Sequence, residues 1–314
     1  MFGIFVDFSL LVVSLASLVF IADKLIDHSV KFAKIVGVSG AVIGLTLLAY
    51  GTSVPEFAVS SIASYGTHDQ LSVSNIIGSN IYNIAMVLGI AAIILPFSWK
   101  DDFRRDGIFM IFATLVLIPL AFIGGISPLS GLMMVFLLAI YSYYVIRKDK
   151  KVDSDGNAIK KESGSVKKEF AFCLILLLGV LVAGYFTVEF AVETARGFGI
   201  SEWIIGATIV AAGTSMPETV VSIISAKKKQ MGMSLGNIIG SNYFNVLWIL
   251  GASAIISPLS FHIQDIWIDL LFLFILTGLF FLAVLRKKIT RIYGFIYIGI
   301  YIIFVLHILG FLGF

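Results

Sequence analysis

Apolar residues along the chain form ten long runs, each close to the roughly 20 residues that a helix needs to cross a bilayer. The predicted helices cover residues 4–27, 39–64, 71–95, 105–124, 127–147, 169–195, 201–226, 233–256, 264–285 and 290–312. One long polar segment, RKDKKVDSDGNAIKKESGSVKK from Arg147, divides the runs five and five. Its charge and its Gly, Ser and Asp content predict a flexible linker rather than a domain. We therefore expect two five-helix units, residues 1–147 and 169–314, joined by a linker at 148–168.

Polar residues within these runs follow a pattern that occurs twice. The segment GLTLLAYGTSVPEFAVSSIAS starts at Gly44, and its counterpart GATIVAAGTSMPETVVSIISA starts at Gly206. A second pair, SNIIGSNIYNIAMVLG and GNIIGSNYFNVLWILG, starts at Ser74 and Gly236. Both pairs have the same offset, 218 − 56 = 162 for the glutamates and 245 − 83 = 162 for the last asparagines. This shared offset indicates duplication of a whole half. Because each half has an odd number of spans, the second must enter the membrane from the opposite side, which predicts inverted repeats.

The composition strengthens the membrane interpretation. Hydrophobic residues make up 59% of the 314 residues and charged residues 13%, with a mean hydropathy of +1.03. We therefore expect an all-α polytopic membrane protein with ten transmembrane helices. The single cysteine, Cys173, excludes an intrachain disulfide. No residue pattern pairs a nucleophile with a base, so no enzyme activity is predicted. We also predict no cofactor, no nucleic-acid partner and no obligate protein partner besides the lipid bilayer.

Basic residues predict the orientation of the chain. Nearly all of the 22 Lys and Arg fall in the central linker or in loops on the same side of the predicted membrane. Arg196 is the exception that lies clearly in a loop on the far side. The positive-inside rule then predicts a cytoplasmic linker and two extracytoplasmic termini, in a protein of the cell (cytoplasmic) membrane.

The motif GTSVPE predicts a helix break beside a buried carboxylate. Pro55 lacks an N–H and clashes with the carbonyl four residues back, so the helix should be interrupted near Gly51. Carbonyl oxygens freed there must face protein, water or an ion. The oxygen-bearing residues beside the two breaks are Thr52, Ser53 and Glu56, and Thr214, Ser215 and Glu218. Such hard oxygen donors suit Ca²⁺ and also serve Na⁺.

A polar stripe follows in the next helix of each half. Its members, spaced at i, i+4 and i+8, are Asn75, Ser79 and Asn83 in the first half, and Asn237, Ser241 and Asn245 in the second. The remaining residues are apolar or small, so the stripe should face the protein interior. Gly78 and Gly240 would permit close helix approach.

Other polar residues have simpler interpretations. Hydroxyl and amide side chains in membrane helices more often join helices than bind ligands, and this interpretation applies to Ser72, Ser74, Ser234, Asn80 and Asn242. A glutamate in the middle of an apolar run is costly and indicates function. Asp27 and Glu189 lie near helix ends, so we interpret them as interfacial. The four histidines have no ligand spacing, which argues against a transition-metal site.

The paired GTSxPE and GSNxxN motifs resemble the two repeats of the cation/Ca²⁺ exchanger superfamily, and most closely those of prokaryotic Na⁺/Ca²⁺ exchangers. The resemblance extends over nearly the whole chain. It implies that the four motif helices form a central ion-binding core. It also implies that the first helix of each repeat packs outside this core and slides between inward-open and outward-open states.

The resemblance also implies a set of ion ligands. Glu56 and Glu218 would be the central ligands. The remaining ligands would be Thr52, Ser53, Thr214 and Ser215, the carbonyl groups of Ala49 and Ala211, and Ser79, Asn83, Ser241 and Asn245. Na⁺/Ca²⁺ exchangers usually have an aspartate at one of the positions of Asn83 and Asn245, whereas this chain has asparagine at both. The glutamate that H⁺/Ca²⁺ exchangers place in the second motif helix is also missing.

Together these features predict a secondary antiporter that exchanges Ca²⁺ for Na⁺ by alternating access. Exchange of Ca²⁺ for protons or another monovalent cation is the first alternative. A cation channel is the second, because broken helices and buried acids also line pores.

Overall fold

The computed structural model describes residues 2–65, 69–98, 103–149, 158–200, 209 and 211–311. The first half consists of α1 (Phe2–Val36), α2 (Gly40–Ile43), the π-helical turn η1 (Gly44–Leu48), α3 (Ala49–Thr52), α4 (Val54–Tyr65), α5 (Asp69–Tyr82), the π-helical turn η2 (Asn83–Val87), α6 (Leu88–Ile94), β1 (Phe97–Ser98), α7 (Arg104–Leu115), α8 (Leu117–Phe122), β2 (Gly125–Ile126) and α9 (Pro128–Arg147). The second half consists of α10 (Val166–Gly197), α12 (Ala211–Gly213), α13 (Met216–Lys227), α14 (Met231–Phe244), the π-helical turn η4 (Asn245–Leu250), α15 (Gly251–Ile256), β3 (Leu259–Ser260), α16 (Ile263–Arg286), β4 (Lys288–Ile289) and α17 (Arg291–Ile308). The fold is therefore almost entirely helical.

The described helices agree with most of the predicted membrane spans. Eight of them are long and apolar enough to cross a bilayer, and a bent pair, Gly40–Thr52 with Val54–Tyr65, makes a ninth within the described ranges. The seventh predicted span, 201–226, begins outside the described residues, so the count of ten remains a prediction.

The predicted limit of the first helix was wrong. The prediction ended it at residue 27, but α1 continues to Val36 because a polar stretch continues a helix as readily as an apolar one once the helix leaves the hydrocarbon layer. Gly37, in the left-handed region with φ of 80°, follows its end.

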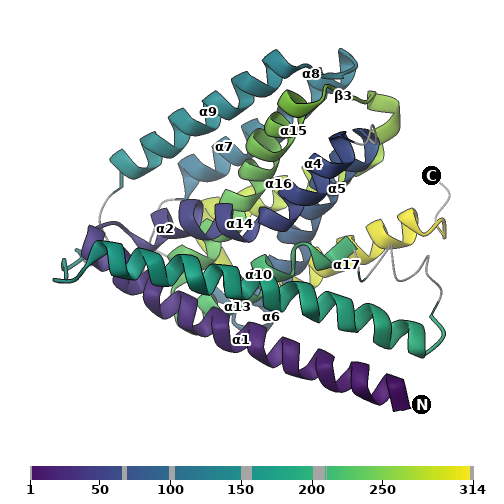
Figure 1. Ribbon diagram of the computed structural model, residues 1–314. Coiled ribbons are helices and arrows are strands. Elements are labelled where there is room, and N and C mark those ends of the chain that lie inside the picture. Colours follow the sequence, from purple (N-terminus) through teal and green to yellow (C-terminus); the bar gives the residue numbers. More distant parts are fainter. Residues whose placement is uncertain are drawn as a thin grey trace.

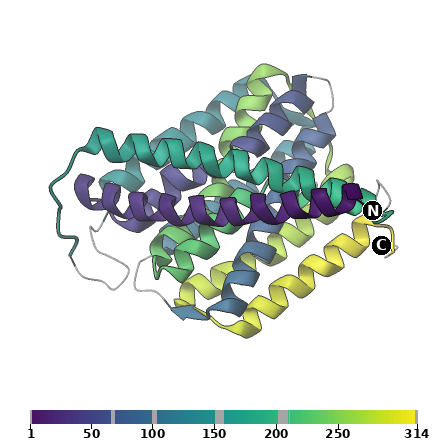
Figure 2. The ribbon, with the colours of Figure 1, turned by 60° about the horizontal axis from the view of Figure 1, so that its bottom comes forward.

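The two longest helices lie side by side along one face of the molecule. Figures 1 and 2 both show α1 against α10, while α9 lies on the opposite side in Figure 1. Between these layers, α14 packs against α2 and η1, and α4 packs against α5. The start of α1 and the end of α17 lie on the same side of the molecule in both views (Figures 1 and 2). The segments that carry the repeated motifs thus occupy the interior.

Glycine permits the closest approach in this interior. A Cβ atom at Gly240 would lie 2.7 Å from the Ala49 Cβ and 2.9 Å from the Leu45 carbonyl oxygen. At Gly236 it would lie 2.7 Å from the Ala41 carbonyl oxygen. The expected role of Gly240 is therefore confirmed. Around Gly78 no described residue comes within 4 Å of such a Cβ, and Ala207, the counterpart of Leu45 in the repeat, lies outside the described residues.

Two short antiparallel strand pairs join the halves. β1 pairs with β4, with Phe97 opposite Ile289, and β2 pairs with β3, with Ile126 opposite Leu259. Phe97 and Leu259 occupy equivalent positions of the repeat, because 259 − 97 = 162. The first half thus contributes one strand to each pair, and so does the second.

The predicted flexible linker is partly anchored. Asp149 accepts a hydrogen bond from the Ser39 backbone N–H at 2.7 Å, beside the start of α2. Further along, the Lys34 Nζ lies 2.7 Å from the Glu162 carboxylate, and the Glu162 N–H donates to the Lys34 carbonyl. α10 begins at Val166, two residues before the predicted end of the linker. The described parts of the linker therefore pack on the end of α1 and the start of α2, because charged side chains there find opposite charges and free helix-end groups.

Candidate cation-binding site

Each repeated motif breaks its helix at a serine. Ser53, with φ −82° and ψ 13°, separates α3 from α4, and the two parts of this span are bent by 46°. Ser215, with φ −89° and ψ 12°, precedes α13 in the same way. The prediction placed the first break near Gly51, but helical residues continue to Thr52. The reason is that proline fits the first turn of a new helix, where its missing N–H would be unpaired in any case, so α4 begins just before Pro55.

The two breaks bring the glutamates of the two halves into one buried cluster. Glu56 is 0% exposed and Glu218 is 1% exposed. The Ser215 hydroxyl donates to Glu56 Oε1 at 2.8 Å, and the Ser53 hydroxyl donates to Glu218 Oε1 at 2.9 Å. Each carboxylate is therefore held by the serine at the break of the opposite half. The serine and the glutamate of one motif therefore do not bond to one another; each bonds to its counterpart's partner in the other half.

Several oxygen atoms of the predicted site are buried without a hydrogen-bond partner in the described part of the chain. They are Glu56 Oε2, Glu218 Oε2, Thr214 Oγ1, Ser241 Oγ, Asn245 Oδ1 and Asn83 Oδ1. A buried polar atom left without a partner costs about 1–3 kcal/mol, and more when it is charged. Six such oxygens, two of them carboxylate oxygens, are the donor set that a hard cation prefers.

The remaining predicted ligands have other partners or different surroundings. The Thr52 hydroxyl donates to the Leu48 carbonyl at 3.0 Å and lies 3.4 Å from Asn237 Oδ1. The Ala49 carbonyl accepts the Ser53 N–H at 3.3 Å, which leaves one of its lone pairs for another ligand. Ser79 is buried on α5, and Ala211 begins α12.

The first asparagine of each polar stripe bonds to a serine of a neighbouring helix. Asn75 donates to Ser60 Oγ at 2.9 Å, and its counterpart Asn237 donates to Ser222 Oγ at the same distance. Sequence reasoning missed Ser60 and Ser222, although both belong to the repeated segments and are 162 residues apart. These amides connect the helix of the stripe to the helix of the glutamate in each half.

A second amide pair orients Asn245. Asn80 donates through Nδ2 to the Asn242 carbonyl at 3.1 Å, so its Oδ1 faces Asn245 and accepts the Asn245 Nδ2 at 3.1 Å. Because a backbone carbonyl only accepts, this arrangement assigns both amides without ambiguity. The equivalent residue Asn242 donates instead to Ile238 in its own helix at 2.7 Å. The Asn80 side chain therefore joins two helices, as its packing interpretation predicts, whereas the Asn242 side chain bonds within its own helix.

The asparagines at the ends of the stripes begin π-helical turns. η2 starts at Asn83 and η4 starts at Asn245. π-helical turns are rare and concentrate at functional sites. The sequence contains no periodic signal for them, because a single extra residue in a turn is invisible in the hydrophobic pattern.

Ionisable groups outside the site form local pairs. Lys228, just after α13, lies 2.8 Å from Asp23 and 2.6 Å from Asp27 of α1. Burial lowers the pKa of Lys228, but the two carboxylates outweigh it, so the pKa is raised and the ammonium stays charged. Asp27 therefore lies apart from the glutamate cluster and has a partner of its own. No group of three or more His, Cys, Asp or Glu side chains lies close enough to share a metal ion within the described ranges.

A family model for the sodium/calcium exchanger protein matches residues 6–147 and again residues 168–310. The chain belongs to this family. Its first and second matches begin 162 residues apart, the offset of the repeated motifs (168 − 6 = 162). The predicted resemblance is thus confirmed.

Relatives of this family member align over most of its length. It is 32% identical to the inner membrane protein YrbG of Escherichia coli over 80% of each chain. It is 31% identical to the sodium/calcium exchanger MaX1 of Methanosarcina acetivorans, over 81% of this chain and 84% of that one. A solved structure of the sodium-calcium exchanger NCX_Mj superposes with a TM-score of 0.81 and 31% identity, covering 97% of this chain and 99% of that one. The chain is therefore a membrane protein of a cation/Ca²⁺ exchanger family, whose members are transporters.

Proposed function

We propose that this protein is a secondary antiporter that exchanges Ca²⁺ for Na⁺ across the cytoplasmic membrane. The observation that carries the proposal is the buried pair Glu56 and Glu218, held by crossed serine bonds, each with one carboxylate oxygen that has no partner among the described residues. Two carboxylates in a low-dielectric interior repel one another and lose their hydration, which is costly unless a cation compensates them. One Ca²⁺ balances both charges, and so do two Na⁺.

The proposed ligands combine these carboxylates with neutral oxygens. They are Glu56, Glu218, Thr52, Ser53, Thr214, Ser215, Ser79, Asn83, Ser241, Asn245 and the carbonyl groups of Ala49 and Ala211. Neutral hydroxyl, amide and carbonyl oxygens complete the high coordination number that Ca²⁺ requires without adding charge. Na⁺ as the coupling ion is supported by the names of the similar MaX1 and NCX_Mj proteins.

Alternating access around this site is supported by the equivalence of the two halves. The crossed bonds from Ser53 to Glu218 and from Ser215 to Glu56 are identical in type and nearly equal in length. We propose that residues 1–147 and 169–314 are the units of an inverted repeat with ten spans in all. In such a repeat the two halves can exchange conformations, which opens the site alternately to each side of the membrane. We further propose that the linker at 148–168 is cytoplasmic and that both termini are extracytoplasmic, as the basic residues predict.

Ion uptake into proteoliposomes separates this proposal from its alternatives. Vesicles loaded with Na⁺ should take up radioactive Ca²⁺ when external Na⁺ is removed, and vesicles with a pH gradient alone should not. A K⁺ gradient alone serves as the control for a nonspecific monovalent requirement. Uptake driven by the pH gradient without Na⁺ would make the protein an H⁺/Ca²⁺ exchanger. Ca²⁺ flux with no counter-ion requirement and with unitary currents would make it a channel.

A further inference from the structure

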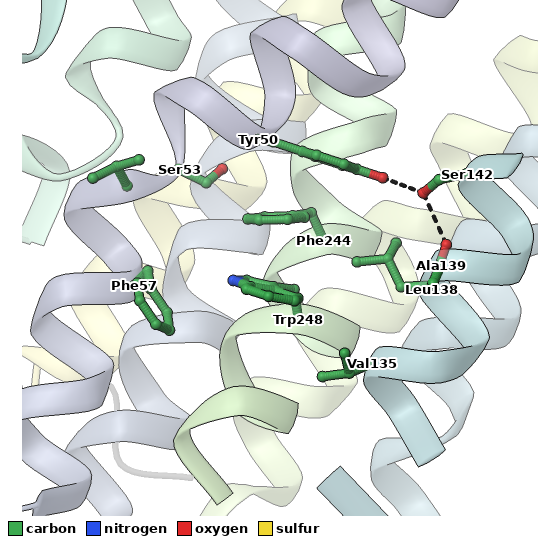
Figure 3. A pocket seen from close by; sticks show the side chains of 10 residues that line it. Tyr50, Ser53, Phe57, Val135, Leu138, Ala139, Ser142, Phe244 and Trp248 are labelled. Carbon is green, nitrogen blue, oxygen red and sulfur yellow. Dashed lines mark hydrogen bonds between the residues drawn. The ribbon is translucent and has the colours of Figure 1, made fainter. Parts of the chain in front are cut away.

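An apolar cavity of about 480 Å³ adjoins the helix break at Ser53. The residues that line it are Tyr50, Ser53, Val54, Phe57, Val135, Leu138, Ala139, Ser142, Phe244 and Trp248. The hydroxyls of Tyr50 and Ser142 bond to one another at its edge, and the Ser53 hydroxyl and the Trp248 indole nitrogen are further polar groups of its lining (Figure 3). Neither glutamate lines the cavity, but Ser53 does, and its hydroxyl donates to Glu218.

One wall of the cavity is a ladder of aromatic rings. The Tyr50 ring stacks on Phe244 with 4.3 Å between centroids, and Phe244 stacks on Trp248 at 6.0 Å. Figure 3 shows these three rings one above another, with side chains of α9 opposite them. Phe57 lies 6.3 Å from Trp248 and continues the wall toward α4. The ladder therefore presents a smooth apolar surface and no charged group.

The cavity opens on the outer surface at the middle of α9. Val54 is 46% exposed, and Ala139 is also exposed. Their neighbours on the outside of α9 are the large apolar side chains Leu132, Met133, Phe136 and Ile140, all of them exposed. An exposed apolar surface in the centre of a membrane-spanning helix faces hydrocarbon. The opening is thus continuous with the lipid-facing surface and lies at the depth of the acyl chains.

We infer that an acyl chain of a bilayer phospholipid enters this cavity and packs on the aromatic ladder beside the helix break. A dry apolar cavity that opens laterally is not a stable place for water, because water there finds too few polar partners. A hydrocarbon chain fills it with dispersion contacts and at no cost in hydrogen bonds. The chain would also cover the outer side of Ser53, which holds the Glu218 carboxylate.

Trp248 provides a direct probe of this occupant. The test uses the full-length protein with Trp248 as its only tryptophan, after replacement of Trp99, Trp203 and Trp267 by phenylalanine. It is reconstituted in phosphatidylcholine whose acyl chains carry bromine, which quenches tryptophan fluorescence only on close contact. We expect quenching of Trp248 about as strong as that of Trp267 in the corresponding single-tryptophan protein, where the side chain is 50% exposed near the start of α16.

A variant that blocks the cavity mouth separates quenching by a lipid inside the cavity from quenching by lipid on the nearby surface. Ala139→Phe places a ring in the mouth of the cavity and should abolish most of the quenching of Trp248. Ile140→Phe makes a similar change one residue away, outside the lining, and should leave it intact. The inference fails if brominated chains do not quench Trp248, or if Ala139→Phe and Ile140→Phe are quenched alike. Because fluorescence is measured without transport, the result stands apart from the proposed exchange activity.

Discussion

At the scale of single residues, the candidate site contains two buried carboxylates that belong to different halves of the chain. Their position in the middle of apolar runs was enough to predict their importance, because a buried acid is too costly to be accidental. The sequence did not show which serine would hold which carboxylate, since that pairing depends on how the halves pack. It also did not show that Asn75 and Asn237 bind serines of neighbouring helices rather than the candidate ion site.

Neutralising either glutamate should abolish transport. Glu56→Gln or Glu218→Gln leaves one carboxylate to balance a divalent ion, and removal of one partner from a buried charged pair costs about 3–5 kcal/mol. That corresponds to a loss of Ca²⁺ affinity of more than about 100-fold. Ca²⁺ uptake by purified variants in proteoliposomes measures it. Glu193→Gln, the same change at an exposed position of α10, is the control and should transport normally.

Asn80 should act as a positioning residue for Asn245. Asn80→Ala removes the acceptor of the Asn245 amide and leaves that donor unpaired, at a cost of about 1–3 kcal/mol. We expect the KM for Ca²⁺ to rise about tenfold while the maximal rate changes little. Asn242→Ala, at the equivalent position, removes only a bond within its own helix and should leave the KM nearly unchanged. In the Asn245→Ala background, the effect of Asn80→Ala on the KM should be much smaller, because only its bond to the Asn242 carbonyl is then lost; a full effect there would mean that Asn80 acts through that bond and not through Asn245.

At the scale of elements, the hydrophobic pattern predicted the helices well and their internal irregularities poorly. The limits of α9, Pro128–Arg147, lie within one residue of the predicted 127–147, because apolar length decides where a helix enters and leaves the bilayer. The proline motif predicted the break at Ser53 to within two residues, whereas the π-helical turns at Asn83 and Asn245 depend on local hydrogen bonds that a run of apolar residues does not reveal.

The packing of α14 on the first broken helix should depend on Gly240. Gly240→Ala would force a Cβ atom to 2.7 Å from the Ala49 Cβ, and overpacking of this kind costs about 1–3 kcal/mol. We expect a lower melting temperature in detergent, measured by thermal unfolding of the purified protein. Gly278→Ala in α16 meets nothing within 4 Å among the described residues and should leave the melting temperature equal or slightly higher. Equal stability of both variants would contradict the close approach.

At the scale of the whole molecule, each half contributes one glutamate and one serine to the same buried cluster. The constant offset in the sequence predicted this, and equivalent contacts recur on both sides of the glutamate pair and in the two strand pairs. The orientation in the membrane depends on charge outside the folded core, and it remains a prediction from the basic residues.

The central linker should be dispensable for exchange. Replacement of residues 150–164 by a Gly/Ser segment of equal length keeps Asp149 and Ser165, which bond to the starts of α2 and α10. It removes the Lys34–Glu162 pair, whose two side chains are 46% and 49% exposed and which is therefore worth at most about 1 kcal/mol. Transport by correctly oriented protein in proteoliposomes should be unchanged. A loss of exchange in folded protein would show that the linker regulates the transporter.

Direct measurement of Ca²⁺ binding tests the central claim, that one site built from Glu56 and Glu218 serves both ions. Equilibrium binding of radioactive Ca²⁺ to the purified protein should saturate at about one ion per chain, because two carboxylates balance one divalent charge. Added Na⁺ should displace Ca²⁺ competitively, and both glutamine variants should bind none. Ca²⁺ binding that survives Glu56→Gln or Glu218→Gln, or that Na⁺ does not displace, would contradict the account.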